Sequence, residues 1–314
     1  MTSQMLFYIR DRHLPGGPKQ IYDLLFIWNE RPGTKTNDIP TETSPAIIRR
    51  NAWRWLARAI GQLLLSVPIM STADGFLRVC TVPPETATYL DWRRLYYYTV
   101  VGFTLHLHVA IIPLLSRLFQ SVVLVLTCLV PLPAVSQKLH RNLASFVQRP
   151  PLFDKPWLSR SVHELWSQRW HQIFRPIFYR IAYKPSRTLF ASPAIGRALG
   201  MFAVFLMSGL MHDYIMLAMI GRHQWQQPGL LGYQTLFFVI QALASIVSVS
   251  PLFPRLPSWL ARLLTILFVI CTAPLFLAPY LRIKLHLVAE VPGFPRLMDS
   301  YIGPVCPYGT AMHP

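Results

Sequence analysis

Hydrophobic residues along this chain gather into long windows that are separated by stretches rich in arginine and proline. A helix that crosses a bilayer needs about 20 mostly apolar residues. Five windows meet or approach that length: Leu95–Leu115, Leu118–Ala134, Ala198–Ile220, Leu231–Ser250 and Leu260–Leu281. A sixth, Trp53–Met70, carries Arg54 and Arg58, so it could span or lie flat at the interface. The pattern predicts an all-α polytopic transmembrane helical bundle with about 5–7 spans and interfacial helices.

The longest stretch between these windows beyond the first hundred residues runs from Val135 to Arg197 and is strongly basic. It holds eleven Lys or Arg residues and only two acidic ones. Basic loops stay in the cytosol when a membrane protein inserts, so we expect this loop there. The N-terminal region is also basic, and three windows between the two regions would place them on opposite sides. We therefore expect the weakest window, Trp53–Met70, to be interfacial or re-entrant.

These patterns divide the chain into three parts. Residues 1–52 form a polar lead-in, residues 53–285 a membrane domain that includes the cytosolic loop over 135–197, and residues 286–314 a C-terminal tail. The first residues have no continuous apolar core of signal-peptide type, because charged residues interrupt it. We expect a multi-pass integral membrane protein of the endoplasmic reticulum.

Within the basic loop, the stretch SVHELWSQRWHQIFRP over 161–176 has the end signals of a helix. Ser161 and Glu164 match the S-x-x-E capping box, in which each side chain satisfies a backbone N–H at the helix start. Pro176 would end the helix, because proline disrupts a helix interior. We therefore expect a helix from Val162 to Arg175 that lies at the membrane surface.

Two neighbouring stripes run along this predicted helix at steps of four residues. The aromatic stripe consists of Trp166, Trp170 and Phe174, and the polar stripe of His163, Ser167 and His171. The rings would lie at headgroup depth and the arginines towards water. An interfacial anchor alone would explain such a helix, so a second polar group is needed to favour a catalytic role.

That second group lies inside the window Ala198–Ile220, in the stretch FLMSGLMHDYIML. An Asp at the centre of a membrane helix costs about 2.5 kcal/mol or more, so His212 and Asp213 indicate a functional site. Loss of water favours the neutral imidazole, which lets His212 act as a general base. Ser208 shares its face and could fix the ring, and Gly209 leaves room for a helix or a substrate chain.

Asp213 points about 100° away from His212 around the helix, so a partner on a different helix or a loop arginine is more natural for it. Polar bonds that only hold helices together are the alternative explanation for both residues. Two further histidines, His106 and His108, point to nearly opposite sides of a helix and indicate a function less strongly.

Composition and charge narrow the classes of partner. Hydrophobic residues make up 53% of the 314 residues and charged residues 14%, a balance that few water-soluble domains show. The net charge of +17 suits anionic headgroups or an anionic substrate, and no nucleic-acid-binding motif accompanies it. The four cysteines have neither zinc nor redox spacing, so they indicate neither a metal site nor a disulfide scaffold.

The two polar segments read PW…SVHELWSQRWHQ and, after one cytosolic stretch, SGLMHD. Together they resemble the wax synthase branch of the membrane-bound O-acyltransferases, where the patterns usually read S-L-x-x-F-W-x-R-R-W-H-Q and S-G-x-x-H-E. Fungal members that acetylate secondary metabolites are also similar, through WNERPGTKTNDIP near the N-terminus. The resemblance covers roughly residues 28–285. It departs at Leu165, Gln168 and Asp213, where Phe, Arg and Glu are commoner.

The resemblance implies an O-acyltransferase that moves an acyl group, with acetyl favoured, from acyl-CoA to a lipophilic alcohol in secondary-metabolite biosynthesis. It assigns His212 as the catalytic histidine and Trp170 with His171 as the tryptophan-histidine pair of the first motif. Arg169 and Arg175 would bind the CoA phosphates, unless they form only a solvated basic face. Ser208 and Asp213 would lie at the substrate, and acyl-CoA would be a co-substrate without any bound cofactor or metal.

Two alternatives stay open. A long-chain wax ester synthase would use the same residues, because acyl chain length depends on the depth of a tunnel. A non-enzymatic transporter or scaffold could line an ion path with His212 and Asp213. A transporter should show paired repeats or broken helices in two matching halves, and the sequence shows none.

Overall fold

The computed structural model describes residues 45–84, 86–129, 135–148, 152–171, 173–250, 256–288 and 299–310. Most of these residues are helical, and within these ranges the backbone forms no strand beyond an isolated bridge between Cys80 and Thr310. The predicted all-α class is confirmed. Most of the predicted N-terminal lead-in lies outside the described residues.

The chain divides into two compact units, and each is described by itself. The described part of unit 1 falls within Pro150–Met219 and Gln234–Thr265. The described part of unit 2 falls within Lys35–Arg149, Ile220–Tyr233 and Ile266–Pro314. Both sequence motifs therefore lie in unit 1.

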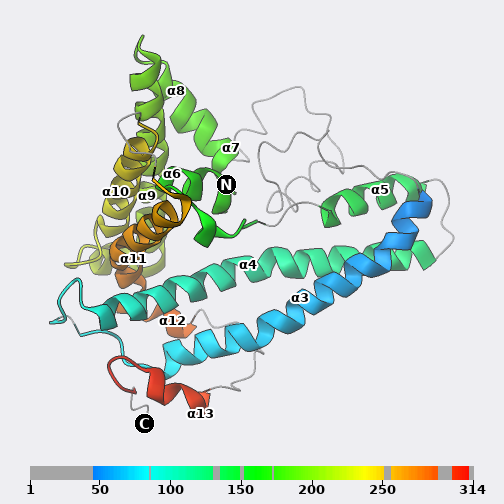
Figure 1. Cartoon of the computed structure of the whole chain (residues 1–314), viewed down its shortest axis with the longest axis horizontal. Coiled ribbons are helices and arrows are strands. Elements are labelled where there is room, and N and C mark those ends of the chain that lie inside the picture. Colours follow the sequence, from blue (N-terminus) through cyan, green and yellow to red (C-terminus); the bar gives the residue numbers. More distant parts are fainter. Residues whose placement is uncertain are drawn as a thin grey trace. The chain divides into compact units, whose positions relative to one another are not determined.

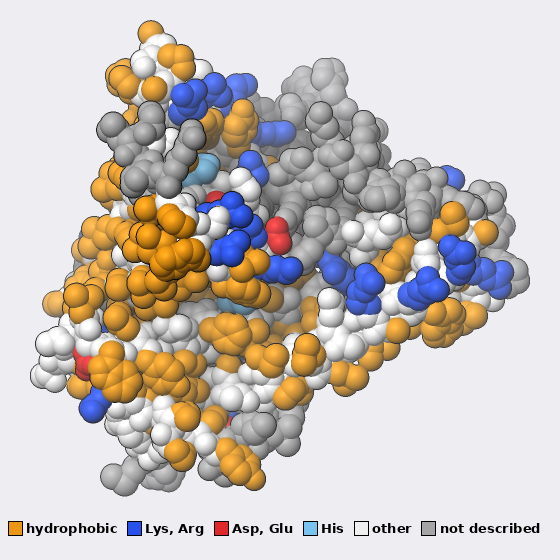
Figure 2. Space-filling view, viewed as in Figure 1, with side chains coloured by type: hydrophobic (Ala, Val, Ile, Leu, Met, Phe, Trp, Pro, Cys, Tyr) orange, Lys and Arg blue, Asp and Glu red, His pale blue; other side chains and the backbone are white. Residues whose placement is uncertain are grey.

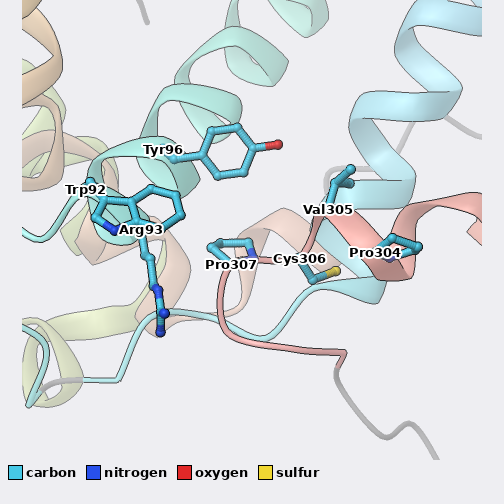
Figure 3. A pocket seen from close by; sticks show the side chains of 7 residues that line it. All are labelled: Trp92, Arg93, Tyr96, Pro304, Val305, Cys306 and Pro307. Carbon is cyan, nitrogen blue, oxygen red and sulfur yellow. The ribbon is translucent and has the colours of Figure 1, made fainter.

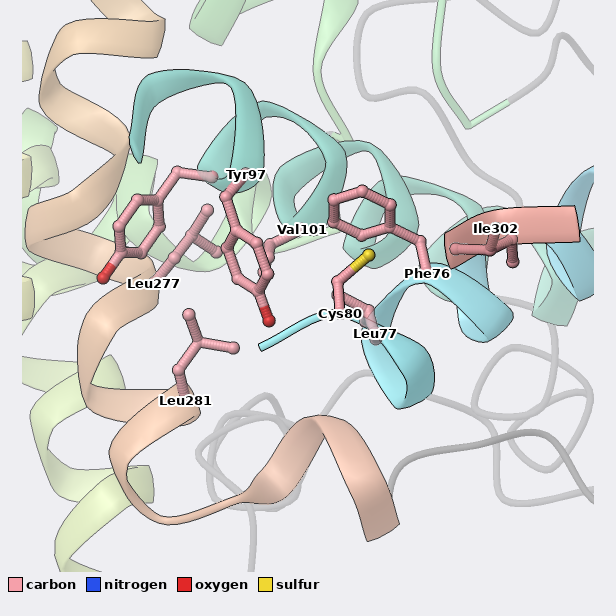
Figure 4. Packing of buried hydrophobic residues seen from close by; sticks show 9 residues of the cluster. Phe76, Leu77, Cys80, Tyr97, Val101, Leu277, Leu281 and Ile302 are labelled. Carbon is pink, nitrogen blue, oxygen red and sulfur yellow. The ribbon is translucent and has the colours of Figure 1, made fainter. Parts of the chain in front are cut away.

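Two long helices, α3 (Pro45–Val79) and α4 (Trp92–Leu129), run side by side in unit 2 (Figure 1). At one end of the pair, the two helices pack around a buried hydrophobic cluster that includes Phe76, Tyr97 and Leu277 (Figure 4). At the other end the helix α5 (Val135–Val147) packs on both of them. The unit ends in three short helices: α12 (Leu285–Val288), α13 (Asp299–Ile302) and η6 (Gly303–Val305).

The helix α4 corrects one sequence-based expectation. The windows Leu95–Leu115 and Leu118–Ala134, which we treated as two spans, belong to one continuous helix of 38 residues up to Leu129. Only Ser116 and Arg117 separate the windows, and neither residue forces a turn. At about 1.5 Å per residue the helix is roughly 57 Å long, well beyond the roughly 30 Å hydrocarbon core of a bilayer.

The length of α4 also changes the expected number of crossings between the two basic regions, which three separate spans would have placed on opposite sides of the membrane. Because α4 is one helix, the described residues between Pro45 and Val135 contain two long helices, α3 and α4. The window Trp53–Met70 lies within α3, which is long and apolar enough to cross a membrane. Two crossings return the chain to its starting side, so the reason for treating Trp53–Met70 as interfacial disappears.

Unit 1 begins with short helical pieces and continues into longer helices. The short pieces are η3 (Pro156–Leu158), α6 (Val162–Glu164), η4 (Leu165–Arg169), α7 (Arg175–Phe178), η5 (Tyr179–Tyr183) and α8 (Lys184–Arg187). The longer ones are α9 (Pro193–Trp225), α10 (Tyr233–Ser248) and α11 (Ser258–Arg282), of which α9 and α11 each continue into unit 2. Near its end, α9 kinks at Gly221, whose φ of 77° suits glycine.

Four described helices are long and apolar enough to cross a membrane by length and composition: α3, α4, α9 and α11. The helix α10 is apolar but shorter, with 16 residues. Apolar side chains cover much of the face seen in Figure 2. On α9, Leu210, Tyr214 and Met219 are exposed, as expected for a helix that faces lipid.

A disulfide joins Cys80, next to the end of α3, to Cys306, 226 residues later. The spacing of the cysteines in the sequence had not indicated this disulfide. Spacing along the sequence reveals only local cysteine pairs, whereas these two meet when the C-terminal segment folds against α3. The other two cysteines, Cys128 and Cys271, are free thiols.

Candidate active site

The first motif starts a helix as predicted. Ser161 Oγ accepts a hydrogen bond from the Glu164 backbone N–H at 3.0 Å. The Glu164 side chain reaches back to the backbone N–H of Arg160 at 2.8 Å, one residue earlier than in the usual capping box. Two N–H groups at the start of the helix are thereby satisfied, which fixes where the segment begins.

The predicted helix from Val162 to Arg175 ends early. After the short α6, the backbone widens into the π-turn η4, and the Trp170 N–H bonds to the Leu165 carbonyl at 2.7 Å. Trp170 then takes an extended conformation, with ψ of 161°. Pro176 does not end this helix but lies in the first turn of α7, where its missing N–H costs nothing. Single π-turns occur often at functional sites.

An ion pair holds this segment together. Arg169 Nε donates to Glu164 Oε1 at 2.7 Å, and a second guanidinium nitrogen donates to the Asp154 carbonyl at 3.1 Å. Burial opposes ionisation of Glu164, but the hydrogen bonds from the Arg160 N–H and from Arg169 outweigh it and lower its pKa. The guanidinium that was expected to bind CoA phosphate is thus engaged inside the protein.

Trp166 packs against α9 and α10 within unit 1. Its ring contacts those of Phe205, Phe237 and Phe238 at centroid distances of 6.0–6.3 Å. Its indole N–H donates to Gln241 Oε1 at 3.1 Å, and Gln241 is fully buried in the middle of α10. The single helix that was expected to carry Trp166 on its aromatic stripe is not formed, because the backbone breaks at Trp170. The depth of Trp166 in a membrane stays a prediction.

His212 lies on the face of α9 that meets α10. Its imidazole stacks on the ring of Phe238, with centroids 5.2 Å apart and planes 12° from parallel. Phe238 also contacts Trp166, so this one phenyl ring touches a side chain from each of the two motifs. Aromatic stacking of this kind fixes the plane of the imidazole and thereby the directions of its two nitrogens.

The tryptophan-histidine pair joins the same cluster. Trp170 contacts Trp166 at 5.5 Å between ring centroids, and His171 contacts both Trp170 and Phe153 at 5.8 Å. His171 lies close enough to His212 for the two imidazoles to interact electrostatically. The structure therefore gathers Trp166, Trp170, His171 and His212 into one cluster within unit 1.

Asp213 has a structural partner on α10. Its carboxylate accepts hydrogen bonds from the backbone N–H and the hydroxyl of Thr235, in the first turn of that helix. A carboxylate at a helix N-terminus is favoured by the backbone dipoles. Gly209 permits this approach, because a Cβ there would lie 2.6 Å from the Thr235 Cα. The room left by Gly209 is thus taken by a helix, and Ser208 is a partly buried neighbour on α9.

The backbone of residues 165–170 is irregular and packs beside two apolar helices. Trp166 contacts the middle of α10 and Phe205 on α9, so residues 165–170 lie beside helices that are apolar over most of their length. Within a bilayer, irregular backbone is stable only where it is buried in protein or lines a cavity. The packing of this segment against α9 and α10 is what such irregular backbone would need at the edge of a bilayer.

The remaining basic residues of the segment face outward. Arg175, Arg180 and Lys184 are exposed, and Arg175 also donates to the Ser167 carbonyl at 3.3 Å. Their positions suit an anionic ligand better than that of Arg169 does. His163 is half-buried, and burial together with the nearby Arg175 lowers its pKa, which keeps its imidazole neutral at physiological pH.

Unit 2 offers a pocket of a different kind. A hollow of about 300 Å³ is lined by Trp92, Arg93, Tyr96 and the segment Pro304–Pro307 (Figure 3). Neither histidine of the motifs lines it, and its ionisable side chains are those of Arg93 and Tyr96, because Cys306 is disulfide-bonded. Among the described residues, no group of three or more His, Cys, Asp or Glu could hold a metal ion.

Sequence reasoning missed three residues of the cluster: Phe153, Phe238 and Gln241. Gln241 carried a signal, because a glutamine inside an apolar window is costly without a hydrogen-bond partner. The two phenylalanines carried none, since an aromatic residue in an apolar or loop segment is ordinary. Only the packing of α10 against α9 and the first motif reveals their role.

Comparison with known proteins agrees with this grouping. Residues 149–240, which contain the whole cluster except Gln241, match a family model described as the membrane bound O-acyl transferase family. This segment of the chain, which is less than half of it, is therefore similar to that family.

Individual relatives come from Arabidopsis thaliana. Acyl-CoA–sterol O-acyltransferase 1 is 29% identical over 137 residues, which cover 41% of this chain and 38% of that protein. Probable long-chain-alcohol O-fatty-acyltransferase 1 is 28% identical over 148 residues, which cover 43% of this chain and 40% of that protein. The chain thus spans about two fifths of the length of these curated relatives. No solved structure matches it.

Proposed function

We propose that this protein is a membrane O-acyltransferase that moves an acyl group from acyl-CoA to the hydroxyl of a lipophilic alcohol. The observation that carries the proposal is the cluster in unit 1. His212, from an apolar helix, meets Trp166, Trp170 and His171, from a broken basic segment, within the stretch that matches the O-acyltransferase family. The relatives named above are O-acyltransferases by name, and both names include an alcohol-type acceptor.

The reaction needs a base for the alcohol and a group that stabilises negative charge. His212 would take the hydroxyl proton while the alcohol oxygen attacks the thioester carbonyl carbon, a role typically worth on the order of 10²–10⁴ in rate. The C–S bond of the tetrahedral intermediate then breaks, the ester forms, and the imidazolium returns its proton to the CoA thiolate. No redox or metal cofactor is required, because the thioester is already activated.

Two neighbours of His212 can stabilise the oxyanion. The Trp170 indole N–H and the His171 imidazole lie in the same cluster as His212, and each can donate a hydrogen bond. A preorganised donor aimed at the oxyanion typically contributes on the order of 10²–10³ in rate. The exposed Arg175, Arg180 and Lys184 would hold the phosphates of CoA, whereas Arg169 acts within the segment through Glu164.

The finer assignment is acetyl transfer in secondary-metabolite biosynthesis at the endoplasmic reticulum, and its support is the similarity of WNERPGTKTNDIP near the N-terminus to the fungal members. Long-chain wax ester synthesis is the second candidate, and the plant long-chain-alcohol relatives favour it. The two candidates use the same residues and differ in the acyl chain that the enzyme accepts.

The test is ester formation by microsomes that carry the protein, with radiolabelled acetyl-CoA and long-chain acyl-CoA and a panel of lipophilic alcohols. We expect product with the wild type and a loss of at least about 10²-fold in His212→Ala, at equal protein abundance. Equal yields from the two proteins would exclude His212 as the base. Tyr214→Ala, at an exposed position of the same helix, is the matched control and should keep wild-type activity.

A further inference from the structure

A chain of contacts connects Gln241 to His212. The Gln241 amide lies in the middle of α10 and is fully buried, where an amide is costly unless it is hydrogen-bonded. Its oxygen accepts from the Trp166 indole N–H at 3.1 Å. This bond fixes the orientation of the indole, since Trp166 has no other nitrogen or oxygen atom in its side chain.

The indole in turn supports the ring on which His212 rests. Trp166 contacts Phe238 at 6.0 Å between centroids, and Phe238 stacks on His212 at 5.2 Å. Phe238 and Gln241 are three residues apart on α10 and therefore share a face of that helix. Trp166 also contacts Trp170, so a tilt of the indole would disturb both the base and the candidate oxyanion donor.

We propose that Gln241, Trp166 and Phe238 are positioning residues for His212, a role that rests on the proposed acyl transfer. Gln241 aligns Trp166, Trp166 and α10 hold Phe238, and Phe238 sets the plane of the imidazole. A base that is displaced by a fraction of an ångström transfers protons less well, although substrate still binds. Loss of the Gln241 bond should therefore lower kcat and leave the KM for acyl-CoA unchanged.

The same helix supplies a matched control. Gln234 is also a fully buried glutamine of α10, and neither its amide oxygen nor its nitrogen has a hydrogen-bond partner among the described residues. Gln234→Met and Gln241→Met make the same chemical change at equal burial. Only the second removes a bond to Trp166.

The experiment measures kcat, KM and abundance for both variants, for Trp166→Phe and for the double variant Trp166→Phe/Gln241→Met. We expect Gln241→Met to lower kcat on the order of tenfold at constant KM and abundance, and Gln234→Met to match the wild type. Trp166→Phe removes the N–H donor, so the double variant should be no worse than the poorer single variant.

Three outcomes would overturn the positioning role. They are a wild-type kcat in Gln241→Met, a loss that follows abundance alone, and additive losses in the double variant. If the wild type forms no ester with any substrate of the panel, the proposed function fails and the positioning role fails with it. If the wild type is active and Gln241→Met equals it, only the positioning role fails.

A second and independent inference concerns the orientation of the chain in the membrane. The C-terminal segment 299–310 is bonded to the adjacent ends of α3 and α4 by a disulfide, an ion pair and two hydrogen bonds. These are the Cys80–Cys306 disulfide, the Arg78–Asp299 ion pair at 2.6 Å, the hydrogen bond from the Thr81 N–H to the Gly309 carbonyl at 3.0 Å, and the hydrogen bond from the Tyr308 hydroxyl to Asp91 at 3.0 Å. Burial and the bond to Asp91 raise the pKa of Tyr308, so its hydroxyl stays protonated as a donor.

The disulfide also constrains how many times the chain crosses. Disulfides persist in oxidising compartments, and two bonded cysteines must lie on the same side of the membrane. Between Cys80 and Cys306 lie α4, α9, α10 and α11. Three crossings by the long helices alone would place the two cysteines on opposite sides, whereas four crossings, with the 16-residue α10 included, place them on the same side.

We infer that the disulfide end of unit 2 faces the oxidising side of the membrane and that Val135–Arg197 faces the cytosol. The distribution of arginine supports this independently. Arg49, Arg50, Arg54 and Arg58 lie near the start of α3, the end opposite to Cys80, and the eleven basic residues of Val135–Arg197 follow α4. Both basic regions fall on the cytosolic side by the crossing count and by the positive-inside rule.

Single cysteines in a Cys128→Ser/Cys271→Ser background test this orientation. Thr86, between α3 and α4, and Thr188, after α8, are both exposed. In sealed microsomes, a membrane-impermeant maleimide should label Thr188→Cys at once and Thr86→Cys only after the vesicles are opened. Under denaturing conditions, polyethylene glycol maleimide should add two tags to the background protein only after reduction.

Labelling of Thr86→Cys in sealed vesicles, or protection of Thr188→Cys, would overturn the orientation. Two tags without reduction would show that the disulfide is absent and would remove the argument that α10 crosses. Cys80→Ser identifies the paired cysteine, because it should yield one tag without reduction. This experiment needs no acyltransferase activity, so its result is separate from that of the proposed function.

Discussion

At the scale of single residues, the structure shows which of the residues expected at the substrate have a hydrogen-bonding partner within the protein. Arg169 and Asp213 were both expected to contact substrate, and both are engaged inside the protein, with Glu164 and Thr235. A sequence shows that a charge lies in an unusual place but not which partner satisfies it. His212 is different, because the ring contact that the structure gives its imidazole is a stack on the phenyl ring of Phe238 rather than an ion pair.

His171 offers a prediction at this scale. The side chain is part of the aromatic cluster through Phe153 and Trp170 and lies near His212. His171→Ala should therefore lower kcat at unchanged abundance, by about 10- to 10³-fold, because an oxyanion donor or orienting group is lost. Ester formation and immunoblotting of the same membrane fraction measure both quantities.

Trp166→Ala supplies the comparison for His171→Ala. Removal of a surface anchor would lower only abundance, whereas the partly buried Trp166 contacts Phe238 and donates a hydrogen bond to Gln241. Trp166→Ala should thus lower both abundance and the kcat of the protein that remains. A fully active His171→Ala enzyme would contradict a role for this imidazole in the reaction.

At the scale of elements, the junction of α9 and α10 determines where His212 lies. Gly209 allows the two helices to approach, and Asp213 caps the first turn of α10 through Thr235. Gly209 lies three residues before His212 and Asp213 directly follows it, so the junction and His212 share one stretch of α9. A substitution at Gly209 or Asp213 should therefore mainly lower the stability of the protein and, to a lesser degree, shift the position of His212.

Asp213→Ala is the prediction at this scale. It leaves the Thr235 N–H and hydroxyl without their acceptor and removes a favourable charge from a helix N-terminus. We expect a loss of about 1–3 kcal/mol in stability, seen as a lower midpoint of thermal unfolding in detergent. Asp213→Asn keeps an acceptor oxygen and should lose less. Equal unfolding midpoints for the wild type and Asp213→Ala would show that the cap contributes nothing.

At the scale of the whole molecule, apolar helices and basic loops agree on one arrangement in the membrane. If the four long helices and the shorter α10 all cross, as inferred above, the start of α3 and the segment 299–310 lie on opposite sides. The basic segment Val135–Arg197 would then face the cytosol, which is the side from which the proposed function requires acyl-CoA to enter. The Cys80–Cys306 disulfide supports the same arrangement, because it holds its two cysteines on one side of the membrane.

The sequence alone determined the helical class, the two motifs and the start of the first motif's helix. Each of these depends on local properties: apolar length, the spacing of polar groups, and the capping pair Ser161 and Glu164. It also singled out His212, since a histidine next to an aspartate in an apolar helix is costly at any position in any fold.

Only the tertiary structure decided what those groups touch. The inward turn at Trp170, the bond between Trp166 and Gln241, and the pairing of Cys80 with Cys306 join residues that are far apart in sequence or depend on one backbone torsion. Two apolar windows became one helix because nothing between them breaks the backbone. Local patterns report the cost of placing a group in a membrane, whereas the partner that offsets the cost is set by packing.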